Sequence, residues 1–218
     1  MLILVGRVIS VRARRQRVHG AEVGVLVVDT DVVRVEQQLL RGDLECPGCG
    51  AVLAPWGHGR PREVRGDLGA RLFLRPRRSR CSGCRVTHVL LAQAVLPRRL
   101  DAASVIQAGL EIAARGMGHR PIAGVLGLAE GTVRGWIRRF ALRAEDVRRH
   151  FTVVLVALAD EPVVPEASRS PLADAVSAVV AAHRAAGMKW AGVNTVSRWE
   201  FAGRAIGGGL LACACAPG

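Results

Sequence analysis

Four cysteines stand in two Cys-x-x-Cys pairs, Cys46-Pro-Gly-Cys49 and Cys81-Ser-Gly-Cys84, with an arginine-rich stretch between them. A tight turn of this kind supplies two soft sulfur donors, and its backbone N–H groups also bond the sulfurs. Two such turns together provide the four ligands of a closed tetrahedral site, which leaves no position for a catalytic water. The sequence therefore predicts structural Zn²⁺ held by Cys46, Cys49, Cys81 and Cys84.

Two alternatives to this zinc site stay open. A thioredoxin-like redox pair also uses Cys-x-x-Cys, but it would not need the second pair. His58 and His88 lie close to the cysteines in sequence and could replace a ligand, although surface or packing histidines are the more common case. Cys213 and Cys215 form a Cys-x-Cys near the end of the chain, and we interpret them as incidental.

Local sequence around the cysteines predicts the elements that position them. Gly48, Gly50 and Gly83 stand where such turns require positive φ angles. The segment Ala70–Arg75 alternates apolar and basic residues, and Val86–Leu91 is rich in β-branched residues. We expect these two segments to be the strands that flank the second turn, as in a zinc ribbon.

A second constellation lies between His119 and Arg143 and has the pattern of a helix-turn-helix. Gly127 is expected to make the turn, and Ala123 is the small residue where the two helices approach. The second helix would present its outer face to base edges and phosphates. The apolar packing positions are Ile122, Leu126, Leu128, Val133, Trp136, Ile137 and Phe140. The predicted DNA-contacting residues are Thr132, Arg134, Arg138 and Arg139.

Three departures weaken this pattern, and an αα-hairpin that only contributes to a core is the alternative. Ala129 stands where an N-cap residue that also touches phosphate is usual. Glu130 suits the helix dipole but repels DNA, unless it accepts a bond from a cytosine amine. Gly131 and Gly135 each cost the helix about 1 kcal/mol relative to alanine. A decaying gene copy would also explain these departures.

The composition favours a nucleic-acid partner. The 218 residues carry a formal net charge of +13, and Lys189 is the only lysine. Between Arg60 and Arg99 the acids are only Glu63 and Asp67, whereas a uniform coding bias would spread the arginines evenly. Guanidinium groups bind phosphate oxygens bidentately. Phosphate contacts are predicted for Arg75, Arg77, Arg78 and Arg80.

The elements together predict an α+β protein in four parts. A basic arm, a strand over Val23–Val28 and a helix capped within Asp29–Asp31 and ended by Gly42 make up residues 1–43. A zinc-ribbon-like module of short strands covers residues 44–97. A helix-turn-helix DNA-binding domain covers 98–143, and a C-terminal helical region covers 144–218. Beyond the motif's own helices, the expected helices are about 101–115, 144–159 and 170–187.

The region from Val25 to Phe140 resembles a family of uncharacterised proteins of high-G+C bacteria that join a zinc-ribbon-like module to a helix-turn-helix. The resemblance rests on Cys46–Cys49, the arginine-rich run ending at Cys84, Leu96-Pro-Arg-Arg99, Ser104-Val-Ile106 and Thr132–Phe140. The order of modules is also similar to the N-terminal DNA-binding part of insertion-sequence transposases. This resemblance implies DNA binding and a mobile-element context, and it implies no catalytic activity.

The leading hypothesis is a sequence-specific DNA-binding protein, either a transcription regulator or the DNA-recognition component of a transposition system. A complete transposase would need three carboxylates on a ribonuclease-H-like sheet. The few acids after Arg143 are expected on helices and loops, so we predict that the chain is not an enzyme. A nonspecific DNA- or RNA-binding zinc ribbon is the alternative, but the chain has no tyrosine and few aromatic residues for base stacking.

The expected location is the cytoplasm, in association with the nucleoid. The apolar Met1–Val5 precedes its arginines instead of following them, and Phe151–Ala159 is far shorter than the ~20 residues that span a bilayer. The expected partner is double-stranded DNA. A transposase or a second copy could bind the C-terminal helices, where Leu172–Ala182 suits a dimer seam, although a core helix is the preferred interpretation.

Overall fold

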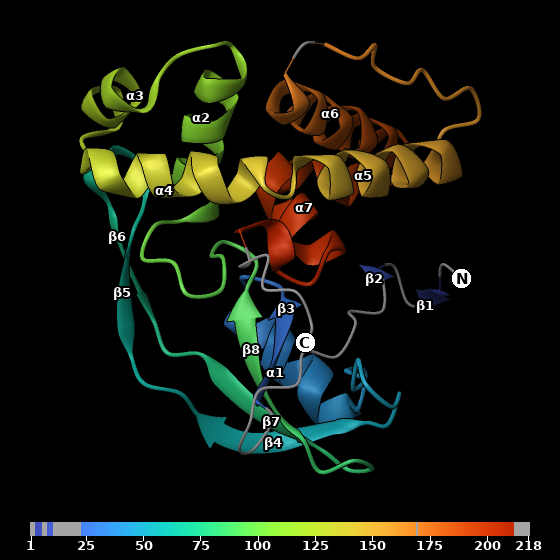
Figure 1. The fold of residues 1–218 in the computed structure, drawn as a ribbon. Helices are drawn as coiled ribbons and strands as arrows, with labels where there is room; N and C mark the ends of the chain where they lie inside the picture. The colour runs from blue at the N-terminus through green and yellow to red at the C-terminus, as the bar shows by residue number, and fades with distance from the viewer. Residues whose placement is uncertain (1–2, 6–7, 11–22, 169, 212–218) are drawn as a thin grey trace, which may run out of the picture. The chain divides into compact units, whose positions relative to one another are not determined.

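The computed structural model describes residues 3–5, 8–10, 23–168 and 170–211 (Figure 1). The chain divides into two compact units, which are described separately below. Unit 1 comprises residues 1–102 with 203–209, and unit 2 comprises residues 103–202 with 210–218. Strands dominate the first unit and helices the second, which confirms the predicted α+β class.

A four-stranded sheet with the order β3-β8-β7-β4 organises unit 1. Its strands are β3 (Val23–Val28), β4 (Leu53–His58), β7 (Arg77–Cys81) and β8 (Thr87–Ala92). β3 runs parallel to β8, and the other neighbouring pairs are antiparallel. The predicted strand at 23–28 is confirmed, and it belongs to the same sheet as the strands around the cysteines.

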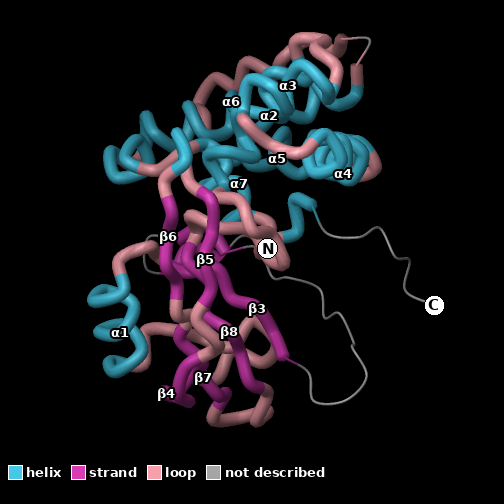
Figure 2. Tube along the Cα trace, turned by 90° about the vertical axis from the view of Figure 1, so that its left-hand side faces the viewer, coloured by secondary structure: helices cyan, strands magenta, loops and turns pink. Residues whose placement is uncertain are grey.

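Helix α1 (Val32–Arg41) covers one face of this sheet (Figure 2). Its ends are the predicted ones: the Asp31 carboxylate accepts hydrogen bonds from the N–H groups of Val33 and Arg34, and Gly42 ends the helix with φ 76°. Val35 and Leu39 turn inward from the helix. The resulting core consists of Val28, Val35, Leu39, Cys46, Leu53, Cys81 and Leu90.

The strand expected over 70–75 does not flank the second cysteine pair. β6 (Arg71–Leu74) pairs with β5 (Arg62–Arg65) in a separate two-stranded sheet. The strand that precedes the second pair is β7, which pairs with β8. The expectation was wrong because β7 is rich in arginine and lacks apolar alternation, and Pro76 separates it from β6.

The remaining short elements of the described chain are β1 (Ile3–Val5), β2 (Val8–Ser10) and the 3-10 helices η1 (Asp67–Gly69), η2 (Ala191–Thr195) and η3 (Gly209–Leu211). β1 and β2 pair with each other in antiparallel orientation. They lie in a part of the chain for which the sequence predicted no element.

Helices α2 to α7 build unit 2, with the last residues of α7 assigned to unit 1. They are α2 (Ala103–Ala114), α3 (His119–Leu126), α4 (Glu130–Ala141), α5 (Ala144–Leu158), α6 (Pro171–Lys189) and α7 (Arg198–Ala205). Figure 1 shows α4 and α5 nearly in line, with α6 beside α5. The helices predicted over 101–115, 144–159 and 170–187 are confirmed, and Ser170 caps α6 by accepting a bond from the N–H of Ala173.

Aromatic side chains fill the core of unit 2. Phe140 of α4 is fully buried and meets the ring of Trp199 edge-on, with 5.1 Å between the centroids. Phe151 of α5 and Phe201 of α7 lie 6.1 Å apart in the same core. The central part of α6 buries its small side chains, which supports the interpretation of this helix as a core helix.

Helix α7 was not predicted, although its sequence carries a start signal. The Ser197 Oγ accepts a bond from the Glu200 N–H, and the Glu200 carboxylate accepts one from the Ser197 N–H. This reciprocal pair is a capping box, which the Ser-x-x-Glu spacing indicates. No helix in the described part of the chain is long and apolar enough to cross a membrane.

The Phe140–Trp199 contact gives a test of the core of unit 2. Phe140→Ala should lower the free energy of unfolding by about 3–5 kcal/mol, because it removes a fully buried ring and leaves a cavity. The matched control is Met188→Ala, since the Met188 side chain is 86% exposed and its loss should change stability by less than about 0.5 kcal/mol. Urea unfolding followed by helical circular dichroism measures both; equal effects of the two substitutions would contradict this packing.

Candidate metal centre

The two cysteine pairs converge on one point in unit 1. The Sγ atoms of Cys46 and Cys84 are 3.6 Å apart, and those of Cys49 and Cys81 are 3.4 Å apart. All four sulfurs lie within 4.8 Å of one another. A disulfide would require about 2.05 Å between sulfurs, and the four cysteines are free thiols. The predicted ligands are therefore brought together.

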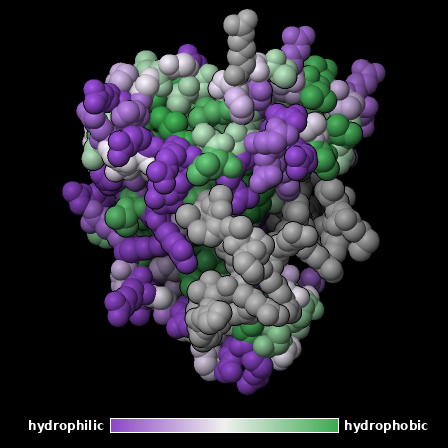
Figure 3. All heavy atoms as spheres, viewed as in Figure 1, coloured by the Kyte–Doolittle hydropathy of each residue, from purple (hydrophilic) through white to green (hydrophobic). Residues whose placement is uncertain are grey.

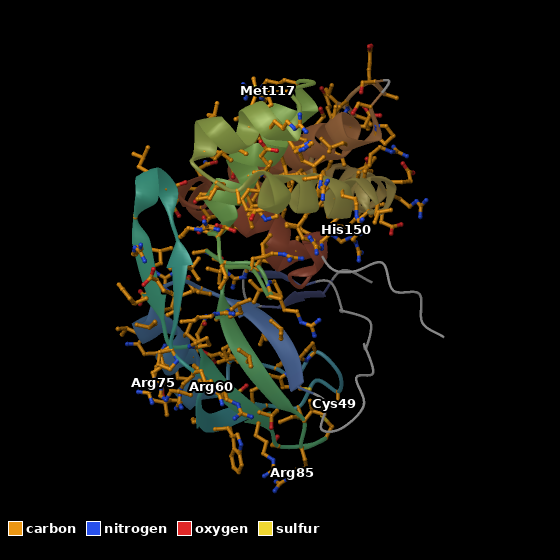
Figure 4. The ribbon with its side chains drawn as sticks, turned by 60° about the vertical axis from the view of Figure 1, so that its left-hand side comes forward. Cys49, Arg60, Arg75, Arg85, Met117 and His150 are labelled. Carbon is orange, nitrogen blue, oxygen red and sulfur yellow. The ribbon has the colours of Figure 1, made fainter. Side chains whose placement is uncertain are left out.

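The spacing of the sulfurs fits a tetrahedral metal ion. Four thiolates held about 2.3 Å from a zinc ion lie about 3.8 Å from each other. The Cys46–Cys84 and Cys49–Cys81 separations are close to that value and no pair is farther apart than 4.8 Å, so the four sulfurs are close enough to hold a metal ion. Cys46 and Cys81 are buried, whereas Cys49 and Cys84 are exposed, which places the site at the surface of the unit (Cys49 in Figure 4).

The two cysteine turns have the same backbone hydrogen bond and the same left-handed residue. In each turn the N–H of the first cysteine bonds to a carbonyl five residues ahead: Cys46 to Ala51 at 2.8 Å and Cys81 to Val86 at 2.9 Å. In each, the residue after the second cysteine has a left-handed conformation, with φ 77° at Gly50 and 64° at Arg85. Such a conformation costs a non-glycine residue about 1–2 kcal/mol.

The prediction of positive φ angles is confirmed at Gly50 and wrong at Gly48 and Gly83, which do not adopt them. The chain reverses after the second cysteine of each turn, so the left-handed residue falls there and not between the cysteines. Gly83 has a different reason to be glycine: a Cβ atom on it would lie 2.9 Å from the Cβ of Ala51 and 3.6 Å from the Sγ of Cys49. Close approach of the two turns requires its absence.

His88 lies against the cluster, whereas His58 lies apart from it. The Nε2 of His88 is 3.4 Å from the Sγ of Cys46, and the ring is buried. Burial lowers the pKa of His88, which favours the neutral ring. In the tautomer with the proton on Nε2, the ring donates to the sulfur, a bond that would stabilise the thiolate formed when a metal ion binds. His58 is exposed on β4 and is not among the clustered groups.

Burial and hydrogen bonding give the thiols of the metal-free cluster different pKa values. Loss of hydration raises the pKa of Cys46 to about 12, because a buried thiolate is disfavoured. The backbone N–H of Ala51, and next the Cys81 thiol, lower the pKa of Cys49 to about 6. At neutral pH Cys49 is therefore a thiolate while Cys46 keeps its proton, and a metal ion that binds all four sulfurs must displace protons.

The arginines predicted to contact phosphate have different surroundings. Arg77 donates two hydrogen bonds to the Glu36 carboxylate, at 2.8 and 2.9 Å, and one to the carbonyl of Gly57. This guanidinium therefore ties α1 to the sheet. Arg80 and Arg78 lie on the opposite face of β7, and Arg75 is exposed beside Arg60 (Figure 4). Phosphate binding by these residues stays a prediction.

The residues predicted to contact base pairs lie on α4. Arg134 and Arg138 are exposed, and Thr132 and Arg139 are partly buried. The Nη1 of Arg139 donates to the carbonyl of Gly135 at 3.1 Å. A Cβ atom at Gly135 would lie 2.8 Å from this Nη1, which is the end of a flexible side chain that can move aside.

Residues 46–121 match the family model of a domain of unknown function (DUF6431). The match covers all four cysteines and ends within α3, but it spans less than half of the chain. Searches of curated proteins and of solved structures returned no match.

Removal of one thiolate tests the metal centre. Cys49→Ser and Cys84→Ser should each release the bound metal and unfold the region from Leu44 to Leu96, because ligand binding and folding are coupled in such small modules. Elemental analysis of the purified protein should give about one metal ion per chain before substitution. Cys213→Ser is the matched control and should leave the metal content unchanged. Wild-type protein without metal, purified without a chelator, would refute the site.

The protonation of the buried thiol predicts how metal binding depends on pH. Because the pKa of Cys46 is raised to about 12, this group binds a proton throughout the neutral range and must lose it to the metal. Apparent metal affinity should therefore rise by at least about tenfold for each unit of increasing pH. Competition with a chromogenic chelator at several pH values measures the slope, and a flat profile would contradict this protonation state.

Proposed function

We propose that the chain is a sequence-specific DNA-binding protein with structural zinc, which acts as a transcription regulator or as the DNA-recognition component of a transposition system. The pair of helices α3 and α4, joined by a left-handed glycine turn, carries this proposal. The zinc centre has a structural role in it, and no catalytic step is assigned to the chain.

Zinc is the metal that best suits the cluster. Four thiolates form a soft ligand set, which favours zinc over the hard cations that prefer oxygen. With all four positions filled by sulfur, the ion would have no open position for water or substrate. Its role is then to hold the two cysteine turns together beside the hydrophobic cluster that contains Cys46 and Cys81.

The α3–α4 pair has the features of a helix-turn-helix. Gly127 ends α3 with φ 63°, and α4 begins three residues later at Glu130. The packing positions Ile122 and Val133 are fully buried, as is Phe140, and Trp136 is 3% exposed. Gly109 of α2 touches the Trp136 ring, since a Cβ there would lie 3.4 Å from it. Four of the seven predicted packing positions are therefore buried within unit 2, and Leu126, Leu128 and Ile137 are partly buried.

The opposite face of α4 is basic and open. Arg134 and Arg138 are exposed on it, one turn apart, and each guanidinium can reach a base edge or a phosphate. Figure 3 shows mainly hydrophilic side chains over this helix, on the left of the view. Glu130 forms a 3.4 Å ion pair with Arg120 of α3, which offsets its charge at the start of the helix.

Substitution of Arg134 tests sequence recognition. Arg134→Ala should cost about 1–3 kcal/mol for the specific duplex and relax the preference at one or two base pairs. Arg75→Ala should weaken binding to specific and scrambled duplexes alike, and lower the salt dependence by about one counterion. Arg184→Ala, at an exposed arginine of α6, is the control with the same loss of charge.

The target duplex is first obtained by sequencing genomic fragments crosslinked to the protein, and affinities are then measured at two salt concentrations. A palindrome near the protein's own promoter supports a regulator, and the inverted ends of an element support transposition. If Arg134→Ala weakens specific and scrambled duplexes equally, α4 does not recognise sequence. The chain would then be a nonspecific nucleic-acid-binding protein.

A further inference from the structure

The four-stranded sheet of unit 1 has a second face, opposite α1. Side chains at 79 and 81 on β7 point toward α1 and are buried, as are 88 and 90 on β8. The alternating residues therefore point to the other face: Arg78 and Arg80 on β7, and Thr87 and Val89 on β8. On the edge strands, Val25 is 38% exposed and Trp56 is 49% exposed. Among the described residues, the side chains on this part of the face are exposed or partly exposed, and we call it the open face.

The open face combines an exposed indole ring with a cluster of guanidinium groups. The Cζ of Arg80 lies 4.7 Å from the centroid of the Trp56 ring, and the Nε of Arg80 donates to the backbone carbonyl of Arg85. These contacts hold the ring and the guanidinium in place at the end of the sheet nearest the second cysteine turn. Figure 4 shows Arg85 projecting from that same end.

Arg85 occupies a position that glycine would fill at lower cost. The equivalent residue of the first cysteine turn is Gly50, and both have left-handed backbones. The backbone therefore gives no reason for arginine at this position, and the Arg85 side chain is exposed. Arg78, Arg80 and Arg85 give this face three positive charges, and none of the described residues that we assign to the face is acidic.

We propose that this face, formed by Trp56, Arg78, Arg80 and Arg85, binds an unpaired nucleic-acid strand. A base stacks on the exposed indole ring, while the guanidinium groups contact the flanking phosphates. The ring favours an unpaired strand over a duplex, because bases inside a duplex already stack on each other and offer no free face. The positive charge favours a polyanion over an uncharged peptide. The surface lies in a different unit from α4 and goes beyond the function proposed above.

The full-length protein is tested by fluorescence anisotropy against a labelled thymidine oligonucleotide of about 12 residues. The wild-type protein should bind it, and Trp56→Ala should weaken binding by about 5- to 150-fold, the range expected for one stacked base. Trp56→Phe should keep most of the affinity, since a ring remains. Trp190→Ala is the matched control, because Trp190 also has a cation, Lys189, over its ring but belongs to unit 2. Unchanged metal content verifies that the variants fold.

Equal oligonucleotide binding by wild type and Trp56→Ala overturns the proposal, as does wild-type protein that binds duplex DNA but no unpaired strand. If Trp56→Ala changes the oligomeric state of the protein but not its oligonucleotide binding, the face contacts a second copy of the chain. That result also overturns the proposal. A uridine oligoribonucleotide in parallel distinguishes RNA from single-stranded DNA as the source of the strand, and binding to either with loss in Trp56→Ala supports the proposal. Arg134→Ala should weaken duplex binding only, so that failure of either proposal is recognised separately.

Discussion

The convergence of four sulfurs within 4.8 Å is the constraint on which unit 1 depends. The first cysteine turn leads into β4, and the second joins β7 to β8, so that their meeting aligns β4 with β7. Four thiolates at this distance repel each other unless a cation lies among them. With the proposed metal ion bound, folding of this unit and metal binding are coupled. Gly83 permits the close approach of the two cysteine turns.

An ion pair between Arg77 and Glu36 fixes α1 on the sheet. Because Arg77 is engaged in this pair, it is not free to bind a ligand. The Arg77 side chain is only 17% exposed and holds the Glu36 carboxylate with two hydrogen bonds. The hydrogen bond from Arg77 lowers the pKa of Glu36, so the ion pair persists at pH values low enough to protonate an ordinary carboxylate. Its contribution to stability is lost when pH falls and Glu36 gains a proton.

Much of the local structure was predictable because the signals are short-range. Asp31 and Gly42 mark the ends of α1, and Cys46 to Cys49 specifies a turn wherever it lies. The parallel pairing of β3 with β8 was not predictable, since strands distant in sequence carry no mark of their partner. The open sheet face was not predictable either. The arginines of β7 look alike in sequence, and only the register separates Arg77 from Arg78 and Arg80, the second of which lies against Trp56.

Because the arginines differ in environment, the net charge of +13 does not describe one uniform basic surface. Arginine side chains in this chain have at least three different environments. The largely buried Arg77 forms an ion pair with Glu36, Arg80 lies over the Trp56 ring, and Arg134 is exposed to solvent. Composition alone treats them as one basic surface. Duplex recognition requires a protruding helix that enters a groove, whereas binding of an unpaired base requires a flat ring beside phosphate ligands. In the two proposals made above, the exposed face of α4 serves duplex recognition and the open face of the sheet serves binding of an unpaired strand, so positive charge is common to both surfaces and shape distinguishes them.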